Sequence, residues 1–182
     1  MSITNIKDNL VEGIIFYPSP NCDKRPDDED ISLIVVHAIS LPPGKYGGNE
    51  IEDFFLNKLD ISSNKYFESI KNLKVSSHIV IKRTGEILQF VPFNKRAWHA
   101  GVSSFLGREN CNDYSIGIEL EGSDDSKFED QQYHSLLTLI RLLIKTYPNL
   151  TKEKLVGHSD ISPGRKTDPG PMFEWKKLKD NL

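Results

Sequence analysis

The feature that most constrains the fold is a short apolar run from Leu33 to Ile39, which reads LIVVHAI. A run of this length, rich in β-branched residues and bounded by polar loops, is typical of a buried central strand. His37 is its one polar residue and lies close to its end. We therefore expect the imidazole of His37 at the rim where a sheet meets its loops.

A second strand is expected within residues 113–122, where apolar residues alternate with small or charged ones. One face would carry Ile116, Ile118 and Leu120, and the other Gly117, Glu119 and Glu121. The polar face can border a cleft. Its two carboxylates lie about 7 Å apart along a strand, so the alternation does not decide which of them acts there.

Helical spacing of apolar residues and a hairpin pattern complete the expected architecture. Helices are expected over 49–59, 66–73, 129–147 and 173–182, a short helix after Thr151, a hairpin over 78–91 that turns near Gly85, and irregular loops over 17–30 and 41–48. Strands interleaved with helices favour an α/β or mixed α+β fold, with a central mixed β-sheet flanked by helices. The length fits a single domain that spans 1–182.

Composition and charge argue against several classes of protein. The formal net charge is −3 and no long basic run occurs, so nothing favours binding to nucleic acid. The apolar stretches are too short to span a bilayer, and the polar N-terminus lacks the apolar core of a secretory signal. With only two distant cysteines, Cys22 and Cys111, we expect a cytoplasmic protein. The alternative is a mature form whose leader has been removed.

Three residues have the chemistry of a metal site. His37 ends the first strand, His158 lies in the segment VGHSD before a loop rich in proline and glycine, and Asp168 follows ten residues later. Two histidines and one carboxylate are a ligand set of catalytic zinc, with a fourth position left for water. The spacing alone is not diagnostic, since the sequence has no His-Glu-x-x-His helix. The alternative is a core histidine with satisfied hydrogen bonds together with two surface polar groups.

A set of short motifs adds to this interpretation. In chain order they are VVHAIS (35–40), SSH (76–78), AWHAG (97–101), SIGIELEG (115–122), GHSD (157–160) and KTDPGP (166–171). This ordered set resembles the type 2 N-acetylmuramoyl-L-alanine amidases, a family related to phage T7 lysozyme and to peptidoglycan recognition proteins. Within the family it is most similar to the cytoplasmic enzymes that act on 1,6-anhydro-muropeptides during cell-wall recycling. The resemblance covers roughly residues 13–175.

The resemblance implies a fold, an activity and a set of site residues. The fold would be that of the type 2 amidases and peptidoglycan recognition proteins. The activity would be zinc-dependent hydrolysis of the amide bond between (1,6-anhydro-)N-acetylmuramic acid and L-alanine, with one Zn²⁺ per chain. His37, His158 and Asp168 match the zinc ligands of the family, Glu119 the catalytic acid/base, and Lys166 the group that stabilises charge on the tetrahedral intermediate. For Lys166, the alternative is an ordinary exposed loop lysine.

Four further residues are expected to bind the substrate. Trp98 offers a flat apolar face to a sugar ring, and His99 can form hydrogen bonds to hydroxyl or carbonyl groups. Lys74 and Arg108 carry positive charge for an anionic substrate. For Trp98, the alternative is plain core packing.

The chain departs from the family pattern at three positions. Ala38 stands where an asparagine commonly follows the first ligand, and Lys74 and Asn110 stand where arginines are common. An Arg-to-Lys change keeps the charge but loses the bidentate fork. These changes bear on substrate affinity and leave the hydrolytic residues in place.

Other functions remain as competing hypotheses. A peptidoglycan recognition module without hydrolysis would be expected to lack one of the matched zinc ligands. Here these are all present, as are Glu119 and Lys166. A lytic enzyme of the intact wall would need a wall-binding segment, and a hydrolase that uses Cys111 would need a base near it.

We therefore expect soluble anhydro-muropeptides as ligands, and no nucleic acid, membrane or obligate protein partner. His78 is expected to be structural and His134 to lie at the surface.

Overall fold

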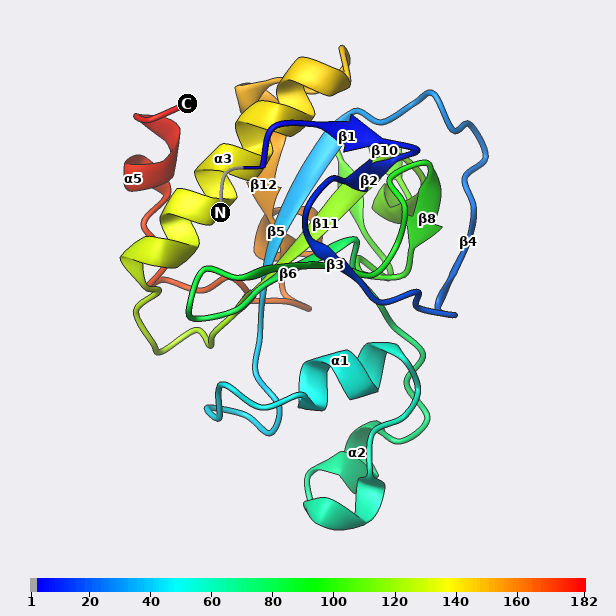
Figure 1. The fold of residues 1–182 in the computed structure, drawn as a ribbon, viewed down its shortest axis with the longest axis vertical. Coiled ribbons are helices and arrows are strands. Elements are labelled where there is room, and N and C mark those ends of the chain that lie inside the picture. Colours follow the sequence, from blue (N-terminus) through cyan, green and yellow to red (C-terminus); the bar gives the residue numbers. More distant parts are fainter. Residues whose placement is uncertain (1–2) are drawn as a thin grey trace.

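A mixed six-stranded sheet forms the centre of the structure, a computed structural model that describes residues 3–182 (Figure 1). In spatial order its strands are β12 (Leu155–Gly157), β5 (Leu33–Ile39), β11 (Ser115–Glu121), β6 (Ile79–Ile81), β7 (Ile87–Gln89) and β3 (Ile15–Phe16). The first four run parallel, and β7 turns back antiparallel to β6. The expected central mixed sheet is confirmed, as is the hairpin, whose turn contains Gly85 at φ 82°.

The two longest strands, β5 and β11, pair in parallel over their whole length. Their register sets Glu121 beside Ile39 and Glu119 beside His37. Side chains of paired residues on neighbouring strands extend from the same face of a sheet. The fold thus places a carboxylate next to the one histidine of the apolar strand.

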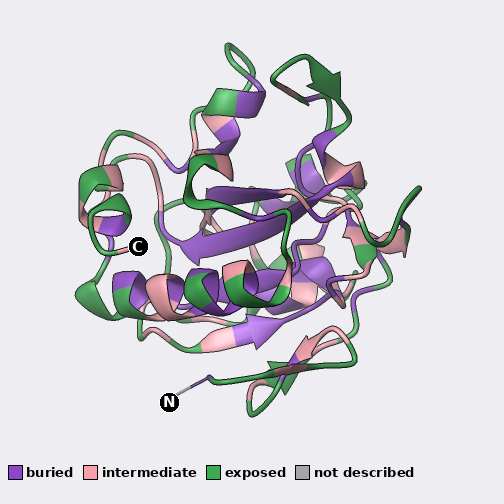
Figure 2. Ribbon diagram, turned by 90° about the horizontal axis from the view of Figure 1, so that it is seen from above, coloured by how far each residue is buried: buried purple, intermediate pink, exposed green. Residues whose placement is uncertain are grey.

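Helix α3 (Asp130–Thr146) covers one face of the sheet, with its buried side toward the strands and its other side exposed (Figure 2). It begins at a capping box in which Glu129 and Gln132 accept hydrogen bonds from each other's backbone N–H groups. The core beneath it combines the apolar residues of the helix with those of β5, β6 and β11. The helix expected over 129–147 and the mixed α+β fold are therefore confirmed.

Two shorter helices, α1 (Glu50–Phe55) and α2 (Phe67–Ile70), lie together at one end of the molecule, away from α3 (Figure 1). They share a second apolar cluster with Val80 and Leu88 of the sheet. Both are shorter than the predicted helices over 49–59 and 66–73. The first ends early because Asn57 adopts a left-handed conformation with φ 59°, which a helix does not accommodate.

The segment 17–30, expected to be irregular, contains a short strand. β4 (Cys22–Lys24) pairs antiparallel with β8 (Lys95–Ala97). The neighbouring Arg25 is 1% exposed and holds this region in place. Its guanidinium donates hydrogen bonds to the backbone carbonyls of Phe93, Asn112, Asp113 and Ser115. The prediction missed this strand because distant partners stabilise it, and no local alternation of apolar residues marks it.

A strand precedes His158, where the sequence predicted a short helix. The turn after Thr151 is limited to the 3-10 helix η3 (Lys152–Lys154), and β12 follows directly with Leu155 fully buried. Because β12 pairs with β5, the edge of the sheet fixes where α4 (His158–Ile161) begins. The last helix, α5 (Trp175–Lys179), is likewise shorter than the predicted 173–182.

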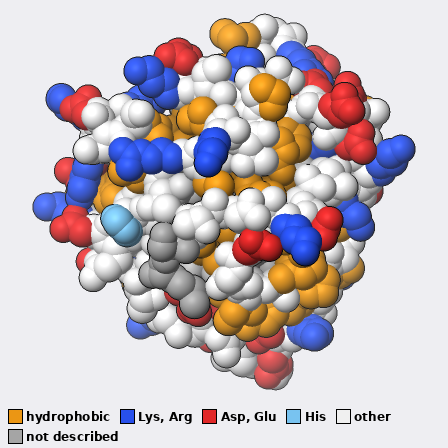
Figure 3. Space-filling model, turned by 45° about the horizontal axis from the view of Figure 1, so that its top comes forward, with side chains coloured by type: hydrophobic (Ala, Val, Ile, Leu, Met, Phe, Trp, Pro, Cys, Tyr) orange, Lys and Arg blue, Asp and Glu red, His pale blue; other side chains and the backbone are white. Residues whose placement is uncertain are grey.

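Short elements complete the chain. They are β1 (Ile6–Lys7), β2 (Leu10–Val11), η1 (Ile61–Ser63), β9 (Ser104–Phe105), β10 (Arg108–Glu109) and η2 (Cys111–Asp113). Within residues 3–182, no helix has the length and apolar character needed to cross a membrane. On the face seen in Figure 3, acidic and basic side chains are interspersed and do not gather into a field of one sign.

His78 is buried and uses both ring nitrogens within the fold. Its Nδ1 accepts a hydrogen bond of 3.0 Å from the backbone N–H of Gly117, so its Nε2 carries the proton and donates to the carbonyl of Lys95 at 3.0 Å. The guanidinium of Arg25 lies 3.1 Å from the same Nε2. Burial, and then the charge of Arg25, lower the pKa of His78 well below its ordinary value of 6.5.

This environment predicts that mild acid destabilises the fold. Below its ordinary pKa of 6.5, His78 takes up a proton in the unfolded chain but not in the native protein, so the free energy of unfolding falls. Between pH 7.5 and 5.5 this residue should account for a loss on the order of 1 kcal/mol. Urea unfolding of the metal-free protein at both pH values measures the loss.

The control is His78→Asn, whose amide oxygen can still accept from Gly117. This variant should be less stable than the wild type at pH 7.5, yet lose less stability on acidification. An identical loss in both proteins would show that His78 does not carry this part of the pH dependence.

Candidate metal centre and active site

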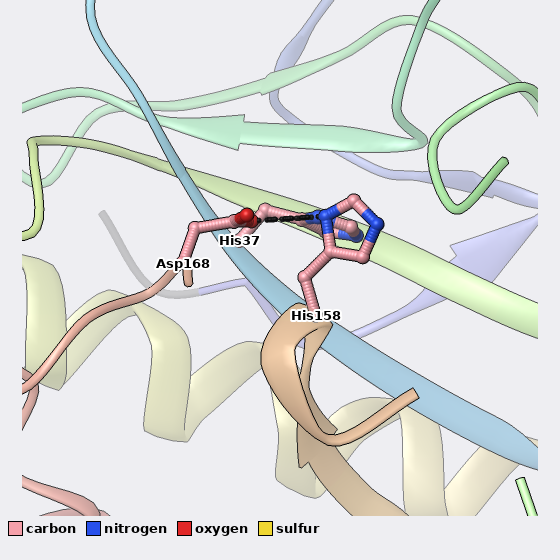
Figure 4. Close-up of side chains that lie close together, drawn as sticks. All are labelled: His37, His158 and Asp168. Atoms are coloured by element: carbon pink, nitrogen blue, oxygen red, sulfur yellow. Dashed lines mark hydrogen bonds and ion pairs between the residues drawn. The ribbon is translucent and has the colours of Figure 1, made fainter. Parts of the chain in front are cut away.

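The fold gathers His37, His158 and Asp168 at one point, as the close-up in Figure 4 shows. His37 lies near the carboxyl end of β5, and His158 directly follows the carboxyl end of the parallel strand β12. Asp168 approaches from the loop beyond α4, and its carbonyl accepts a hydrogen bond from the backbone N–H of Ser159. Parallel strands with a common direction thus present both imidazoles at the same edge of the sheet.

The potential ligand atoms are mutually close. The Nδ1 atoms of His37 and His158 lie 2.9 Å apart, and Oδ2 of Asp168 lies 3.2 Å from the first and 3.1 Å from the second. Ligands of a tetrahedral zinc ion with bonds of about 2.0–2.1 Å are separated by roughly 3.3 Å. The spacing and the types of donor atom therefore fit a small divalent metal ion.

The protonation of the histidines also fits. Nε2 of His158 faces the carbonyl oxygen of Ala100 at 3.0 Å, so it carries the proton and leaves a lone pair on Nδ1. Burial lowers the pKa of His37 to about 4, which keeps this imidazole neutral near pH 7. Neutral imidazoles are the form that binds metal ions.

Glu119 stands beside this cluster. Its Oε1 lies 4.0 Å from Nδ1 of His37, and its Oε2 is buried with no hydrogen-bond partner among the described residues. Burial first, and then the nearby charge of Asp168, raise the pKa of Glu119 well above its ordinary value, while Lys166 opposes the rise. A buried carboxyl with a free oxygen and a raised pKa is suited to proton transfer.

Glu121 shares the face of β11 with Glu119 but has a different environment. Its Oε1 accepts a 2.7 Å hydrogen bond from the backbone N–H of Gly47, and its Oε2 accepts one of 2.9 Å from the backbone N–H of Arg83. The ammonium group of Lys82 lies 3.7 Å away. Both of its oxygens are therefore engaged in holding loops, which distinguishes the two carboxylates that the alternation left equivalent.

A cavity of about 590 Å³ opens above the cluster. His37, His158, Asp168, Glu119 and His99 line its polar part. Apolar side chains from β5, α1, α2 and their connections line another part, among them Ala38, Leu41, Phe54, Ile70 and Leu73. Further polar groups complete the lining, including Ser123, Asp124 and Asp125. The cavity thus joins the cluster of His37, His158 and Asp168, with Glu119, to an apolar wall.

Two cationic residues border the cavity. Lys166 is exposed and lines it, and its charge acts on both Glu119 and His37. Arg165, which the sequence analysis did not single out, also lines it and donates hydrogen bonds to the carbonyls of Ala100 and Val102. Its contacts are with residues more than sixty positions away in the sequence, so no local motif predicts them.

Three of the four expected substrate-binding residues, Trp98, Lys74 and Arg108, do not line this cavity, and their contact with substrate stays a prediction. Trp98 is half-buried, and the pKa of Asp23 is lowered by hydrogen bonds first from Arg96 and also from Trp98, which places the indole beside Asp23. Lys74 borders a separate small pocket of about 120 Å³. His99 does line the cavity.

Arg108 is also engaged elsewhere. Its guanidinium pairs with Asp30 at 2.5 Å and lies 3.8 Å from the centre of the Tyr114 ring. The hydroxyl of the same tyrosine lies 3.2 Å from the buried thiol of Cys111. The cysteine therefore lies in a structural cluster, which gives no support to its use as a nucleophile.

Known proteins are similar to this chain in both sequence and fold. Residues 27–171 match the family described as N-acetylmuramoyl-L-alanine amidase. The 1,6-anhydro-N-acetylmuramyl-L-alanine amidase AmpD of Haemophilus influenzae is 52% identical over 180 residues, which are 99% of this chain and 98% of that protein. The crystal structure of a selenomethionine derivative of AmpD superposes with a TM-score of 0.95 at 49% identity, covering 98% and 99% of the two chains.

A second similar structure contains a ligand. It is a complex of the N-acetylmuramyl-L-alanine amidase AmiD from Escherichia coli with the substrate anhydro-N-acetylmuramic acid-L-Ala-D-γ-Glu-L-Lys. Its TM-score is 0.62 at 32% identity, over 84% of this chain and 57% of that one. With the family match, the near full-length relative and the common fold, this chain belongs to the N-acetylmuramoyl-L-alanine amidase family.

Proposed function

We propose that this protein is a zinc-dependent amidase that cleaves the bond between 1,6-anhydro-N-acetylmuramic acid and L-alanine in soluble muropeptides, in the recycling of peptidoglycan. The observation that carries the proposal is the convergence of His37, His158 and Asp168 beside Glu119, whose buried Oε2 has no hydrogen-bond partner among residues 3–182. The activity named for the AmpD relative supports the choice of reaction. The substrate in the AmiD complex supports the choice of ligand.

His37, His158 and Asp168 would hold one Zn²⁺, which when bound supplies a Lewis acid and lowers the pKa of a water molecule. Glu119 accepts a proton from the attacking water as its oxygen bonds to the carbonyl carbon. Glu119 then returns that proton to the alanine nitrogen while the C–N bond breaks. Lys166 offers positive charge to the oxygen on which negative charge develops.

We further infer that residues 1–182 form one amidase domain that acts in the cytoplasm. The family match spans most of the chain, and the AmpD relative aligns over nearly its full length. The free thiols of Cys22 and Cys111 are compatible with a reducing compartment. Soluble anhydro-muropeptides are the ligands that this role requires, and the proposal needs no protein partner.

The first prediction concerns the metal. The purified protein should contain about one zinc ion per chain, and its removal by a chelator should abolish hydrolysis, which added zinc restores. Asp168→Ala should lower the zinc content, because it deletes one of three ligands. Metal analysis and activity assays measure both effects. Full activity after exhaustive removal of metal would refute a role for zinc.

The second prediction separates proton transfer from metal binding. Glu119→Gln keeps the size of the side chain but removes the basic carboxylate, so turnover per bound zinc should fall about 10²–10⁴-fold. Glu121→Gln is the matched control on the same strand face. It should disturb the loop at Gly47 and stability more than turnover. If Glu121→Gln loses turnover and Glu119→Gln does not, the proton shuttle has been assigned to the wrong residue.

The third prediction concerns substrate choice. The protein should hydrolyse soluble anhydro-muramyl peptides strongly in preference to intact sacculi, since the recycling role involves only soluble fragments. Mass spectrometry of the products from both substrates, at equal enzyme concentration, tests this. Comparable turnover on both would favour a general enzyme of the cell wall.

A further inference from the structure

The second nitrogen of His37 begins a chain of buried hydrogen bonds. Nε2 of His37 lies 2.9 Å from Nδ1 of His99, and Nε2 of His99 lies 3.1 Å from Oγ of Ser115. The hydroxyl of Ser115 in turn donates to the backbone carbonyl of Cys111 at 2.5 Å. Ser115 is fully buried and His99 only 9% exposed, so water does not replace these partners.

The carbonyl at the end fixes the direction of every bond in this chain. A carbonyl oxygen only accepts, so the single proton of Ser115 points to Cys111, and Ser115 must accept from His99. His99 then has its proton on Nε2 and a lone pair on Nδ1. It follows that Nε2 of His37 donates to His99, and the lone pair on Nδ1 of His37 faces the ligand cluster.

We propose that His99 and Ser115 are positioning residues that hold His37 in the metal-binding tautomer. The inference rests on the proposed zinc site and replaces the expected direct contact of His99 with substrate. A ligand histidine that is oriented through its second nitrogen binds metal more tightly, and loss of such a partner costs about 10–100-fold in affinity.

The strand β11 is shaped to admit the imidazole of His99. A Cβ atom at Gly117 would lie 2.4 Å from Cγ of His99, so only glycine leaves room for the ring. Ser115, Gly117 and Glu119 follow one another on a single face of the strand. That face therefore supplies the anchor of the chain, the space for its ring, and the carboxyl at the cluster.

The backbone around His99 serves the second histidine ligand as well. Oδ1 of Asn112 accepts hydrogen bonds from the N–H groups of His99 at 3.1 Å and of Ala100 at 2.8 Å. The carbonyl of Ala100 accepts from Nε2 of His158. Two adjacent residues thus orient both imidazoles, His99 through its side chain and Ala100 through its backbone.

The test measures zinc affinity by competition with a chelator, together with the thermal stability of the metal-free protein. Ser115→Ala removes the acceptor for His99 and should weaken zinc binding about 10-fold or more. Ser77→Ala is the matched control, because Ser77 is equally buried and donates to the carbonyl of Ile79 at 2.7 Å, outside this chain of bonds. It should lose stability but keep the affinity of the wild type.

Two changes at His99 supply a second comparison. His99→Asn retains an acceptor near the position of Nδ1, whereas His99→Leu fills the space without one. The asparagine variant should bind zinc more tightly than the leucine variant, although the leucine variant is at least as stable without metal. A purely structural role would give the same order in both measurements.

The outcomes separate this inference from the proposed function. A wild-type protein that binds no zinc would overturn the proposed function. A wild-type protein that binds zinc, with Ser115→Ala equal to it in affinity, would overturn only the positioning role. Equal zinc affinity of the asparagine and leucine variants at position 99 would do the same.

Discussion

The parallel ladder between β5 and β11 is the interaction on which the site depends. Its register sets His37 beside Glu119, on a face that both strands present to the cavity. A shift of one residue would turn every side chain of β11 to the opposite face, bringing Ile118 or Leu120 to the cluster of His37, His158 and Asp168. The apolar residues that pack against α3 exclude this shift, because they would lose their burial. The core thus fixes the geometry of the polar groups.

Burial of so many polar groups at one sheet edge requires partners for each of them. Arg25 and His78 meet this need by bonding to backbone carbonyls and to Gly117. Glu121 meets it with the N–H groups of two loops. Against this background, the free Oε2 of Glu119 stands out as the one buried side-chain polar atom without a partner among residues 3–182. The proposed proton transfer by Glu119 relies on an oxygen left unpaired in this way.

The sequence predicts the parts of this arrangement that follow from local pattern. The apolar run of β5, the alternation in β11 and the spacing in α3 all locate their elements, since side-chain burial repeats with the period of each structure. The candidate metal-ligand set follows from residue type together with the resemblance to the amidase family. The surroundings of Trp98 and Arg108 cannot be predicted from local pattern, because each side chain contacts a partner distant in sequence, Asp23 and Asp30 respectively. Nor can the chain from His37 to Ser115, whose members come from three separate segments.

The three departures from the family pattern lie in different places relative to the cavity. Ala38 lines the cavity, so the missing amide leaves space and removes a hydrogen-bonding group at the wall. Lys74 and Asn110 lie at other pockets, away from the ligand cluster. The groups of the cluster are held by strand ends and by buried bonds to backbone, whereas much of the wall belongs to loops and short helices. Changes in the wall can therefore alter substrate affinity while His37 and Glu119 stay side by side, since the backbone pairing of β5 with β11 sets these two residues next to each other.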